Sequence, residues 1–233
     1  GDFDPAFNPR LALIYHPFVG STIKALYGTA FRAPNFLELS DPRFQDISPE
    51  EITTYELVYE QELIKHLRSS VSLYYNQMDD LIAFQSGSFT NLDVDCGGLE
   101  LGLEGSWTGG VRCRASYSLQ RTENRSYAAD LTDSPEHLIK AGVSVPLIKE
   151  KVFLGLDYQY TSARHTYYTT TTGDTLPGAD AADFGVLNAT LFSQNLVKNL
   201  ELSASIYNLL DCRYSDPASR FHIQDMLEQN GRT

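Results

Sequence analysis

The residue types that could support catalysis or metal binding occur in this chain, but their spacing favours neither. Two acid pairs, Asp79 with Asp80 and Asp93 with Asp95, could offer oxygen ligands to calcium. Calcium takes about six to eight oxygens, however, and each pair supplies too few. The histidines are scattered, and the chain has no Gly-x-Ser-x-Gly elbow, no P-loop and no dinucleotide-binding glycine pattern. We therefore expect no catalytic residue, no metal site and no cofactor.

Two polar groups at expected strand ends are better explained by turns than by ligand binding. Arg32, Pro34 and Asn35 follow a strand-like segment, where proline ends pairing and asparagine favours a turn. A loop contact, or a latch to another domain, is the alternative. The second group is Asn208, Asp211, Tyr214 and Asp216. These residue types could bind a metal, but their spacing does not fit a set of ligands around one ion, and Asx turns at a strand end explain them.

The net charge limits the possible partners. The 233-residue chain carries a formal net charge of −12, which argues against nucleic acid because there are too few cations to neutralise phosphates. The charge would suit a cationic or metal-chelate ligand, although a solvated acidic surface is the simpler explanation. We therefore expect no nucleic-acid partner.

The three cysteines, Cys96, Cys113 and Cys212, are far apart and odd in number. They match neither a CxxC motif nor a zinc site. We expect small, half-buried strand residues, with a bridge between Cys96 and Cys113 as the alternative.

Alternation of apolar and polar residues recurs along the whole chain and predicts an all-β protein. No apolar run reaches the roughly eighteen residues of a membrane-spanning helix. The chain begins like the middle of a longer protein, so we expect it to be a fragment. About ten segments have the period of two that is typical of strands: 10–15, 21–31, 53–62, 69–77, 99–107, 112–120, 139–145, 152–160, 184–193 and 201–210.

The connections between these segments alternate between short and long. The short ones are 16–20, 64–67, 108–110, 146–150 and 195–199, and the long ones are 32–49, 85–95, 121–136, 162–183 and the region from 212 onward. This rhythm is typical of an antiparallel up-and-down transmembrane β-barrel, with short turns on one side of the membrane and long extracellular loops on the other. We expect 166–183 to be a flexible external loop. Because such loops carry recognition, we expect ligand contacts from loop aromatics: Phe44, Tyr127, Tyr167 and Tyr168.

Each expected strand has one apolar face and one polar face. In a soluble sandwich the apolar face would meet a core, whereas in a barrel it would meet lipid and the polar face would line the lumen. Aromatic residues near strand ends, such as Tyr15, Phe31 and Trp107, favour lipid. In the barrel interpretation, mid-strand charges line the substrate route, hold an inner domain or pair with one another across strands: Glu56, Glu60, Glu100, Glu104, Arg112, Arg114 and Asp157.

Five segments, in order along the chain, resemble the barrels of TonB-dependent outer-membrane receptors. They are YGTAFRAPNFLEL, SPEEITTYELVYEQEL, SVSLYYNQMDDLI, LTDSPEHLIKAGVSVPL and the C-terminal LELSASIYNLLDCRYSDPASRFH with QNGRT. The resemblance implies a barrel of about 22 strands that is plugged by an N-terminal domain. Residues 1–233 would form the C-terminal part of that barrel, without the plug and the closing strand.

The same resemblance implies uptake of a scarce, bulky nutrient, such as a ferric siderophore or a corrinoid-like chelate, across the outer membrane of a Gram-negative bacterium. The implied partners are the TonB–ExbB–ExbD complex, acting through the plug, the outer-membrane lipid and the metal-chelate ligand. The implied role is not enzymatic. Two alternatives are a passive porin-like barrel and a soluble carbohydrate-binding β-sandwich.

Overall fold

In the computed structural model, the described residues are 7–40, 47–85, 88–126, 129–130, 133–148, 151–170, 175–218 and 222–233. They form fifteen strands and one short helix, α1 (Phe36–Ser40). The strands are β1 (Arg10–Tyr15), β2 (Ser21–Arg32), β3 (Glu50–Ile64), β4 (Leu67–Gln85), β5 (Ser88–Ser106), β6 (Arg112–Asn124), β7 (Ala129–Asp130), β8 (His137–Ile148), β9 (Val152–Thr161), β10 (Tyr167–Thr169), β11 (Thr175–Pro177), β12 (Phe184–Val197), β13 (Leu200–Ile206), β14 (Ser215–Pro217) and β15 (Met226–Glu228). None of the described helices is long and apolar enough to cross a membrane.

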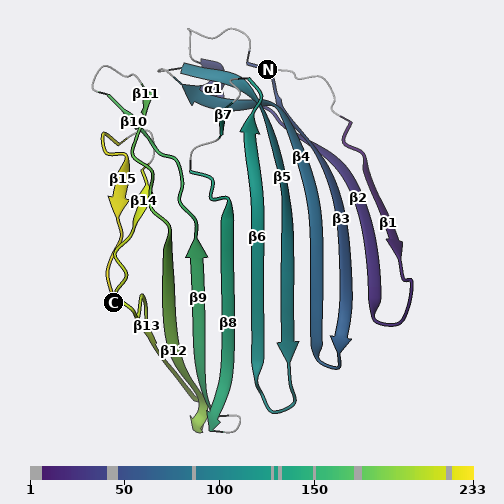
Figure 1. The fold of residues 1–233 in the computed structure, drawn as a ribbon, viewed down its shortest axis with the longest axis vertical. Coiled ribbons are helices and arrows are strands. Elements are labelled where there is room, and N and C mark those ends of the chain that lie inside the picture. The colour runs from purple at the N-terminus through teal and green to yellow at the C-terminus, as the bar shows by residue number, and fades with distance from the viewer. Residues whose placement is uncertain are drawn as a thin grey trace.

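Ten long strands form one antiparallel sheet in which each strand pairs with the next. The order is β1-β2-β3-β4-β5-β6-β8-β9-β12-β13, and the short β7 pairs with β6. Figure 1 shows this sheet as a curved wall that runs from β1 on one side to β13 on the other. All ten strands expected from the alternation are present, so the up-and-down arrangement is confirmed. The two packed sheets of the sandwich alternative do not occur among the described residues.

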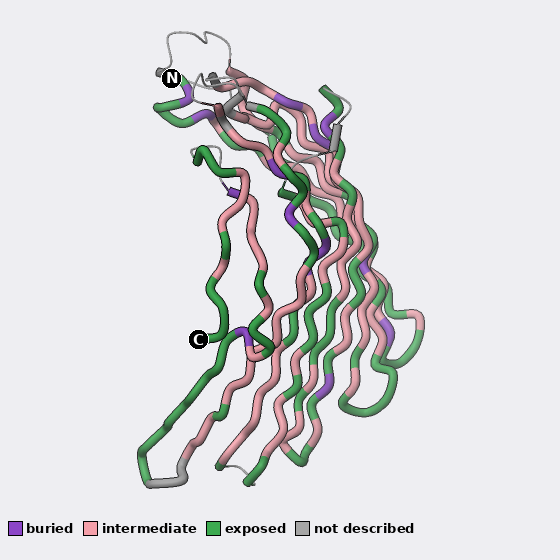
Figure 2. The backbone as a smooth tube through the Cα atoms, turned by 60° about the vertical axis from the view of Figure 1, so that its left-hand side comes forward, coloured by how far each residue is buried: buried purple, intermediate pink, exposed green. Residues whose placement is uncertain are grey.

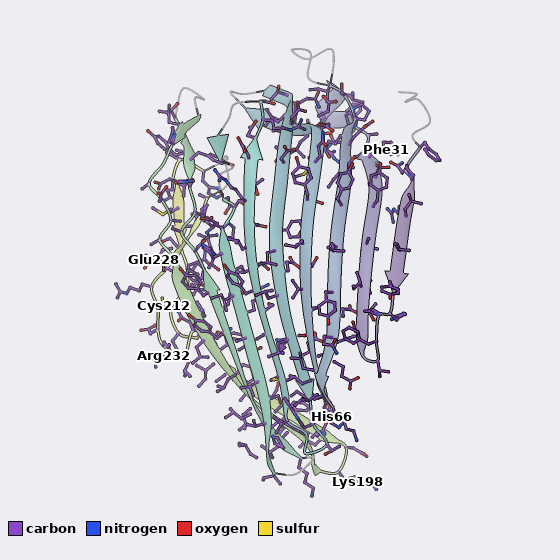
Figure 3. All side chains as sticks on the ribbon, turned by 45° about the vertical axis from the view of Figure 1, so that its right-hand side comes forward. Phe31, His66, Lys198, Cys212, Glu228 and Arg232 are labelled. Atoms are coloured by element: carbon purple, nitrogen blue, oxygen red, sulfur yellow. The ribbon has the colours of Figure 1, made fainter. Side chains whose placement is uncertain are left out.

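The connections place turns at one end of the wall and loops at the other, which we call the turn end and the loop end. His66 and Lys198 lie in connections at the turn end, whereas Phe31 lies at the loop end of β2 (Figure 3). The prediction of a long loop at 85–95 is wrong. β4 and β5 pair as far as Gln85 and Ser88, because the Thr, Phe and Val residues of that stretch continue the alternation as a strand.

The expected external loop at 166–183 contains regular structure in its described part. β10 and β11 form a hairpin in which Tyr167 is opposite Pro177, and Arg164 forms a β-bridge with Ala181. Further along, β14 pairs with β15. The threonines and tyrosines that suggested low complexity are also residues that favour strands.

Strand register gives the wall two different faces. Tyr27, Tyr55 and Tyr75 are opposite one another on successive strands, and the rings of Tyr27 and Tyr55 lie 5.3 Å apart. Their face also carries exposed leucines, among them Leu57 and Leu73. The other face is polar and lines an open hollow of about 1070 Å³ that extends from the β1–β2 turn to β9. We call these the apolar face and the hollow face.

Almost nothing is buried in a conventional core. Among the described apolar residues only Leu92, Val94, Ala181 and Ala218 are buried, and Figure 2 shows few buried positions along the tube. Leu11, Leu13 and Leu57 are 68%, 71% and 48% exposed. Exposed apolar surface on this scale is rare in a soluble monomer and indicates a lipid or protein neighbour.

All three cysteines are free, so the proposed Cys96–Cys113 bridge is wrong. Cys96 is opposite Asn76 and Thr122, whereas Cys113 is opposite Gly105, at the other end of β5. Nine residues separate positions 96 and 105 on one strand, so the two thiols lie far apart and on opposite faces. The expectation that they are partly buried is confirmed, since all three are intermediate in exposure.

Glycines on the hollow face let long side chains cross a neighbouring strand. The Tyr74 hydroxyl donates to Gln120 Oε1 at 3.5 Å, and Gly98 lies between them in the register. A Cβ at Gly98 would lie 2.5 Å from the Tyr74 hydroxyl oxygen and 2.7 Å from the Leu119 carbonyl oxygen. The carbonyl belongs to the backbone and cannot rotate away.

We predict that Gly98→Ala destabilises the protein by about 1–3 kcal/mol, the usual cost of overpacking. Gly109→Ala is the matched control, because a Cβ there would have no atom within 4 Å, and it should change stability by about 0.5 kcal/mol or less. The measurement is urea unfolding of each variant in detergent. Equal midpoints for the two variants would contradict the steric explanation.

Candidate functional site

The expected lumen charges lie together on the hollow face. Register aligns Arg68, Glu104, Arg114 and Asp157 in one row, with Gly142 between the last two. Arg114 Nη2 lies 2.7 Å from Asp157 Oδ1, and the missing side chain of Gly142 leaves room for this contact, since a Cβ there would lie 2.7 Å from the same oxygen. The row therefore crosses five strands, and its four charged side chains alternate in sign.

A second group of wall contacts lies above this row. Lys24 Nζ is 2.7 Å from Glu60 Oε1, and the Ser72 hydroxyl donates to Glu56 at 2.7 Å. Glu100 is opposite Ser72 on the next strand, so it faces the same side. The pairing between strands that the sequence allowed is thus present, while contact with a substrate or an inner domain remains a prediction. Because Arg114 and Asp157 are both largely exposed, their pairing adds little to stability.

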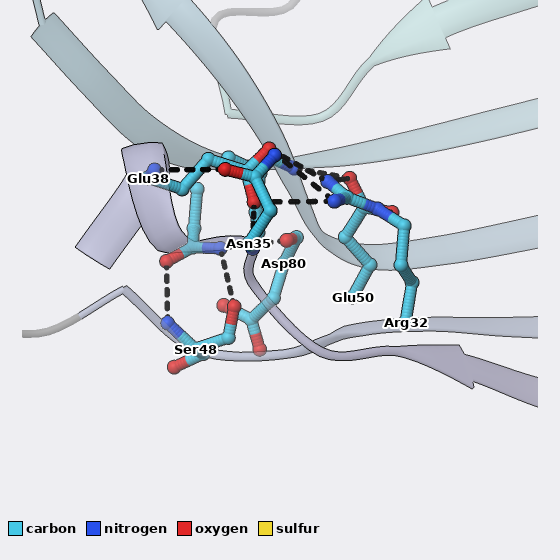
Figure 4. A network of polar contacts seen from close by, with 8 residues as sticks. Arg32, Asn35, Glu38, Ser48, Glu50 and Asp80 are labelled. Carbon is cyan, nitrogen blue, oxygen red and sulfur yellow. Dashed lines mark hydrogen bonds and ion pairs between the residues drawn. The ribbon is translucent and has the colours of Figure 1, made fainter. Parts of the chain in front are cut away.

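At the loop end, Arg32 holds together three separate segments (Figure 4). Its Nε and Nη2 atoms donate to the two oxygens of Glu50 at 2.5 and 2.7 Å. Its Nη1 lies 3.1 Å from Glu38 Oε2 in helix α1, and Glu50 also accepts the Ile82 amide at 2.9 Å. For Arg32 the loop-contact alternative is therefore right, and β2 ends at Arg32, before Pro34, as the turn interpretation expected.

Helix α1 begins with a reciprocal cap. The Glu38 amide donates to Asn35 Oδ1 at 3.0 Å, and the Asn35 amide donates to Glu38 Oε2 at 2.6 Å. This is a capping box, and the spacing of Asn35 and Glu38 in the sequence is the signal that could have predicted the helix. Next to it, Asn91 receives the Ser48 amide at 3.0 Å and donates to the Asp80 carbonyl at 2.6 Å. The β4–β5 hairpin is thereby tied to the start of β3.

The acid pairs that could have suggested a calcium site lie around a second arginine, Arg125. Arg125 forms ion pairs with Asp79 and, at 3.0 Å, with Asp95. Asp93 accepts the Asp80 amide at 3.2 Å. No group of three or more His, Cys, Asp or Glu residues in the described chain is arranged to hold a metal.

A third arginine, Arg164, joins the loop after β9 to two other loops. Its side chain is only 10% exposed, and it lies 2.7 Å from Asp216 and 3.5 Å from Asp133. It also lies over the Phe184 ring at 5.7 Å, and that ring stacks on Tyr214 at 4.1 Å. Partial burial raises the pKa of the Asp133 carboxyl, and the positive charge of Arg164 opposes the rise.

Two members of the C-terminal polar group, Asn208 and Asp211, lie in turns, as expected. The turn interpretation does not hold for Asp216, which lies in β14 and pairs with Arg164. Asn208 accepts the Cys212 amide at 2.9 Å and donates to the Cys212 carbonyl at 2.8 Å, and Asp211 accepts the Arg232 amide at 2.9 Å. Asn208 and Asp211 have φ angles of 51° and 56°, in the left-handed region that Asn and Asp tolerate best among non-glycine residues.

Of the four aromatic residues expected to bind the ligand, the structure describes two. Phe44 and Tyr127 lie outside the described residues. Tyr167 and Tyr168 lie in β10 and are half-buried, so their contact with a ligand stays a prediction. The three arginine contacts were missed, because they join residues that are distant in sequence.

We predict that Arg32→Lys loosens the segment around α1, because lysine cannot donate to Glu50 and Glu38 through one planar fork. Limited proteolysis of the folded protein should then cut near residues 33–40 about tenfold faster, which corresponds to the loss of one strong charged hydrogen bond. Arg68→Lys is the control, since Arg68 has one contact with Glu60, at 3.4 Å. Equal cleavage rates for both variants would mean that Arg32 does not fix the loop.

Comparison with known proteins agrees with this geometry. Residues 2–209 match the family described as TonB dependent receptor-like, beta-barrel. The chain is 27% identical over 220 residues to the Vitamin B12 transporter BtuB of Vibrio cholerae serotype O1, an alignment that covers 88% of this chain and 33% of that protein. The chain thus spans about one third of the length of the curated relatives that it matches.

Solved structures share the fold at lower identity. The ferripyoverdine receptor of the outer membrane of Pseudomonas aeruginosa superposes with a TM-score of 0.77 at 14% identity, covering 97% of this chain and 31% of that one. The ferric-catecholate import receptor Fiu from K12 E. coli gives 0.76 at 17%, covering 96% and 33%. The copper transporter OprC gives 0.73 at 21%, covering 96% and 37%. These structural similarities agree with the family match and with the ten-stranded sheet and its two faces. The chain belongs to the TonB-dependent receptor family and forms part of its transmembrane β-barrel.

Proposed function

We propose that the complete protein containing this chain is an outer-membrane active-transport receptor of a Gram-negative bacterium. It takes up a scarce, bulky metal chelate, of the ferric-siderophore or corrinoid type, with energy from the TonB–ExbB–ExbD complex. Residues 1–233 form the C-terminal part of its barrel, and a plug domain elsewhere in the protein contacts TonB. The protein is not an enzyme.

The observation that carries this proposal is the contrast between the two faces of one ten-stranded wall. The row of Tyr27, Tyr55 and Tyr75 suits the membrane interface, where aromatic girdles lie. A transmembrane strand needs about 9–11 residues, and β3, with 15 residues, is long enough to cross and continue beyond the bilayer. The outer-membrane lipid is therefore the partner of the apolar face.

The hollow face is the part of the wall that the substrate route follows in this proposal. Its charges are wall residues that keep the route wet: Glu56, Glu60, Glu100, Glu104, Arg112, Arg114 and Asp157. Capture of the ligand belongs to the loop end, where Tyr167 and Tyr168 and, outside the described residues, Phe44 and Tyr127 are the candidates. Relatives whose names specify vitamin B12, ferric chelates or copper support a metal-containing ligand.

We predict that uptake requires energised TonB. Cells expressing the complete gene product should accumulate radiolabelled cyanocobalamin or a ferric chelate, and deletion of tonB should reduce accumulation to the level of cells without the gene. A variant lacking the segment that contacts TonB, but with normal outer-membrane levels, is the control for expression. Uptake that continues unchanged without TonB would instead support the passive porin-like alternative.

A further inference from the structure

The charges of the hollow face are segregated by strand. From the row of Glu56 to the turn end, β3, β4 and β5 contribute mainly acids to this face: Glu56, Glu60, Glu62, Glu100 and Glu104, with Arg68 as the one cation. In the same part of the face, β6 and β8 contribute cations: Arg112, Arg114 and Lys140. We call these two sets the acidic area and the basic area of the wall.

Several of these charges have no partner of opposite sign within the described chain. In the basic area, Arg112 and Lys140 are exposed and form no ion pair with another described residue. The same is true of Glu100 and Glu104 in the acidic area. Arg114 has one ion pair, but its side chain remains 74% exposed. The wall therefore presents free charges of both signs to the hollow.

Like charges also lie close to one another in each area. Arg112 and Arg114 are two residues apart on one face of β6, which separates their Cα atoms by about 7 Å. Lys140 is opposite Ser116, the next hollow-face position of β6. Like charges on neighbouring strand positions repel one another, so a neighbour of opposite charge that covers each area would relieve this repulsion.

The hollow in front of these areas fits a protein surface better than a small solute. The larger hollow of about 1070 Å³ adjoins a second one of about 650 Å³, and both are lined by Arg68, Glu104 and Arg114. Together they exceed the roughly 300–1,000 Å³ of an ordinary ligand pocket. The β1–β2 turn adds Phe18 and Val19, which line the larger hollow and are 60% and 99% exposed. Exposed apolar residues beside charged ones are typical of a surface that contacts another protein domain.

Building on the proposed function, which supplies a plug domain, we propose that the acidic and basic areas form a polarised docking surface that sets the orientation of that domain. The plug presents cations to β3, β4 and β5 and carboxylates to β6 and β8. A plug rotated by the width of either area would place like charges together, so complementarity selects one orientation. Exposed ion pairs are individually weak, so the set orients the plug without locking it in place.

The first test identifies the occupant by cross-linking the complete, purified receptor in detergent. A water-soluble carbodiimide joins an amine to a carboxylate where the two are in contact, and mass spectrometry of the digested protein locates the joined residues. We expect Lys140 to be joined to an aspartate or glutamate of the plug. Lys151 is the internal control, because it lies in the β8–β9 turn and lines neither hollow, and it should give no product with the plug.

Charge reversal tests the polarity. One double variant combines Arg112→Glu with Lys140→Glu, and a second combines Glu100→Lys with Glu104→Lys. In each, amide hydrogen exchange of the plug within the complete receptor should become roughly threefold to tenfold faster, as expected for the loss of a few surface charge contacts. The matching glutamine variants, which remove charge without reversing it, should give a smaller effect. Lys151→Glu is the matched control and should leave the exchange of the plug unchanged.

The outcomes separate this inference from the proposed function. Products of Lys140 confined to the wall, in a receptor whose uptake requires TonB, would overturn the docking surface and leave the transport function intact. Equal exchange of the plug in both reversal variants and in the control would overturn the polarity. Uptake without TonB, together with the absence of any plug product, would overturn both. A product between Lys140 and the plug, with faster exchange in both reversal variants, would support the inference.

Discussion

The rest of the structure depends on continuous backbone hydrogen bonding between consecutive antiparallel strands. Each long strand between the edge strands β1 and β13 pairs with both of its neighbours, so the ladder satisfies their backbone without a packed core. Because side chains alternate between faces in a strand, this pairing also fixes which residues face the hollow. One slip of register would exchange the leucines and tyrosines of the apolar face for the charges of the other.

This arrangement changes what stabilises the protein. A water-soluble domain buries its apolar side chains against one another, whereas here most of the apolar face is exposed within the chain, and in the proposed function lipid covers it. The bilayer also demands that every backbone polar group be paired, which favours barrels over open sheets. Stability therefore depends on the ladder and the environment, and local packing matters mainly where glycines such as Gly98 and Gly142 admit long side chains.

The segments at the loop end are held together by different interactions. There the chain leaves the regular ladder, and charged hydrogen bonds replace strand pairing as the main link between segments. Arg32, Arg125 and Arg164 each join residues that are distant in sequence, and the small β10–β11 and β14–β15 hairpins extend the order of these loops.

The sequence by itself determined the strands, their order and their two faces, because a period of two and alternating connection lengths are local patterns. It also identified the family through five short motifs, and it placed Asn208 and Asp211 correctly in turns. Only the tertiary structure revealed the carboxylate contacts of Arg32, Arg125 and Arg164, the extension of β4 and β5 beyond the expected ends and the opposite faces of Cys96 and Cys113. The physical reason is that alternation reports which face a residue occupies, whereas the partner of a long charged side chain depends on which distant segments the fold brings within a few ångströms.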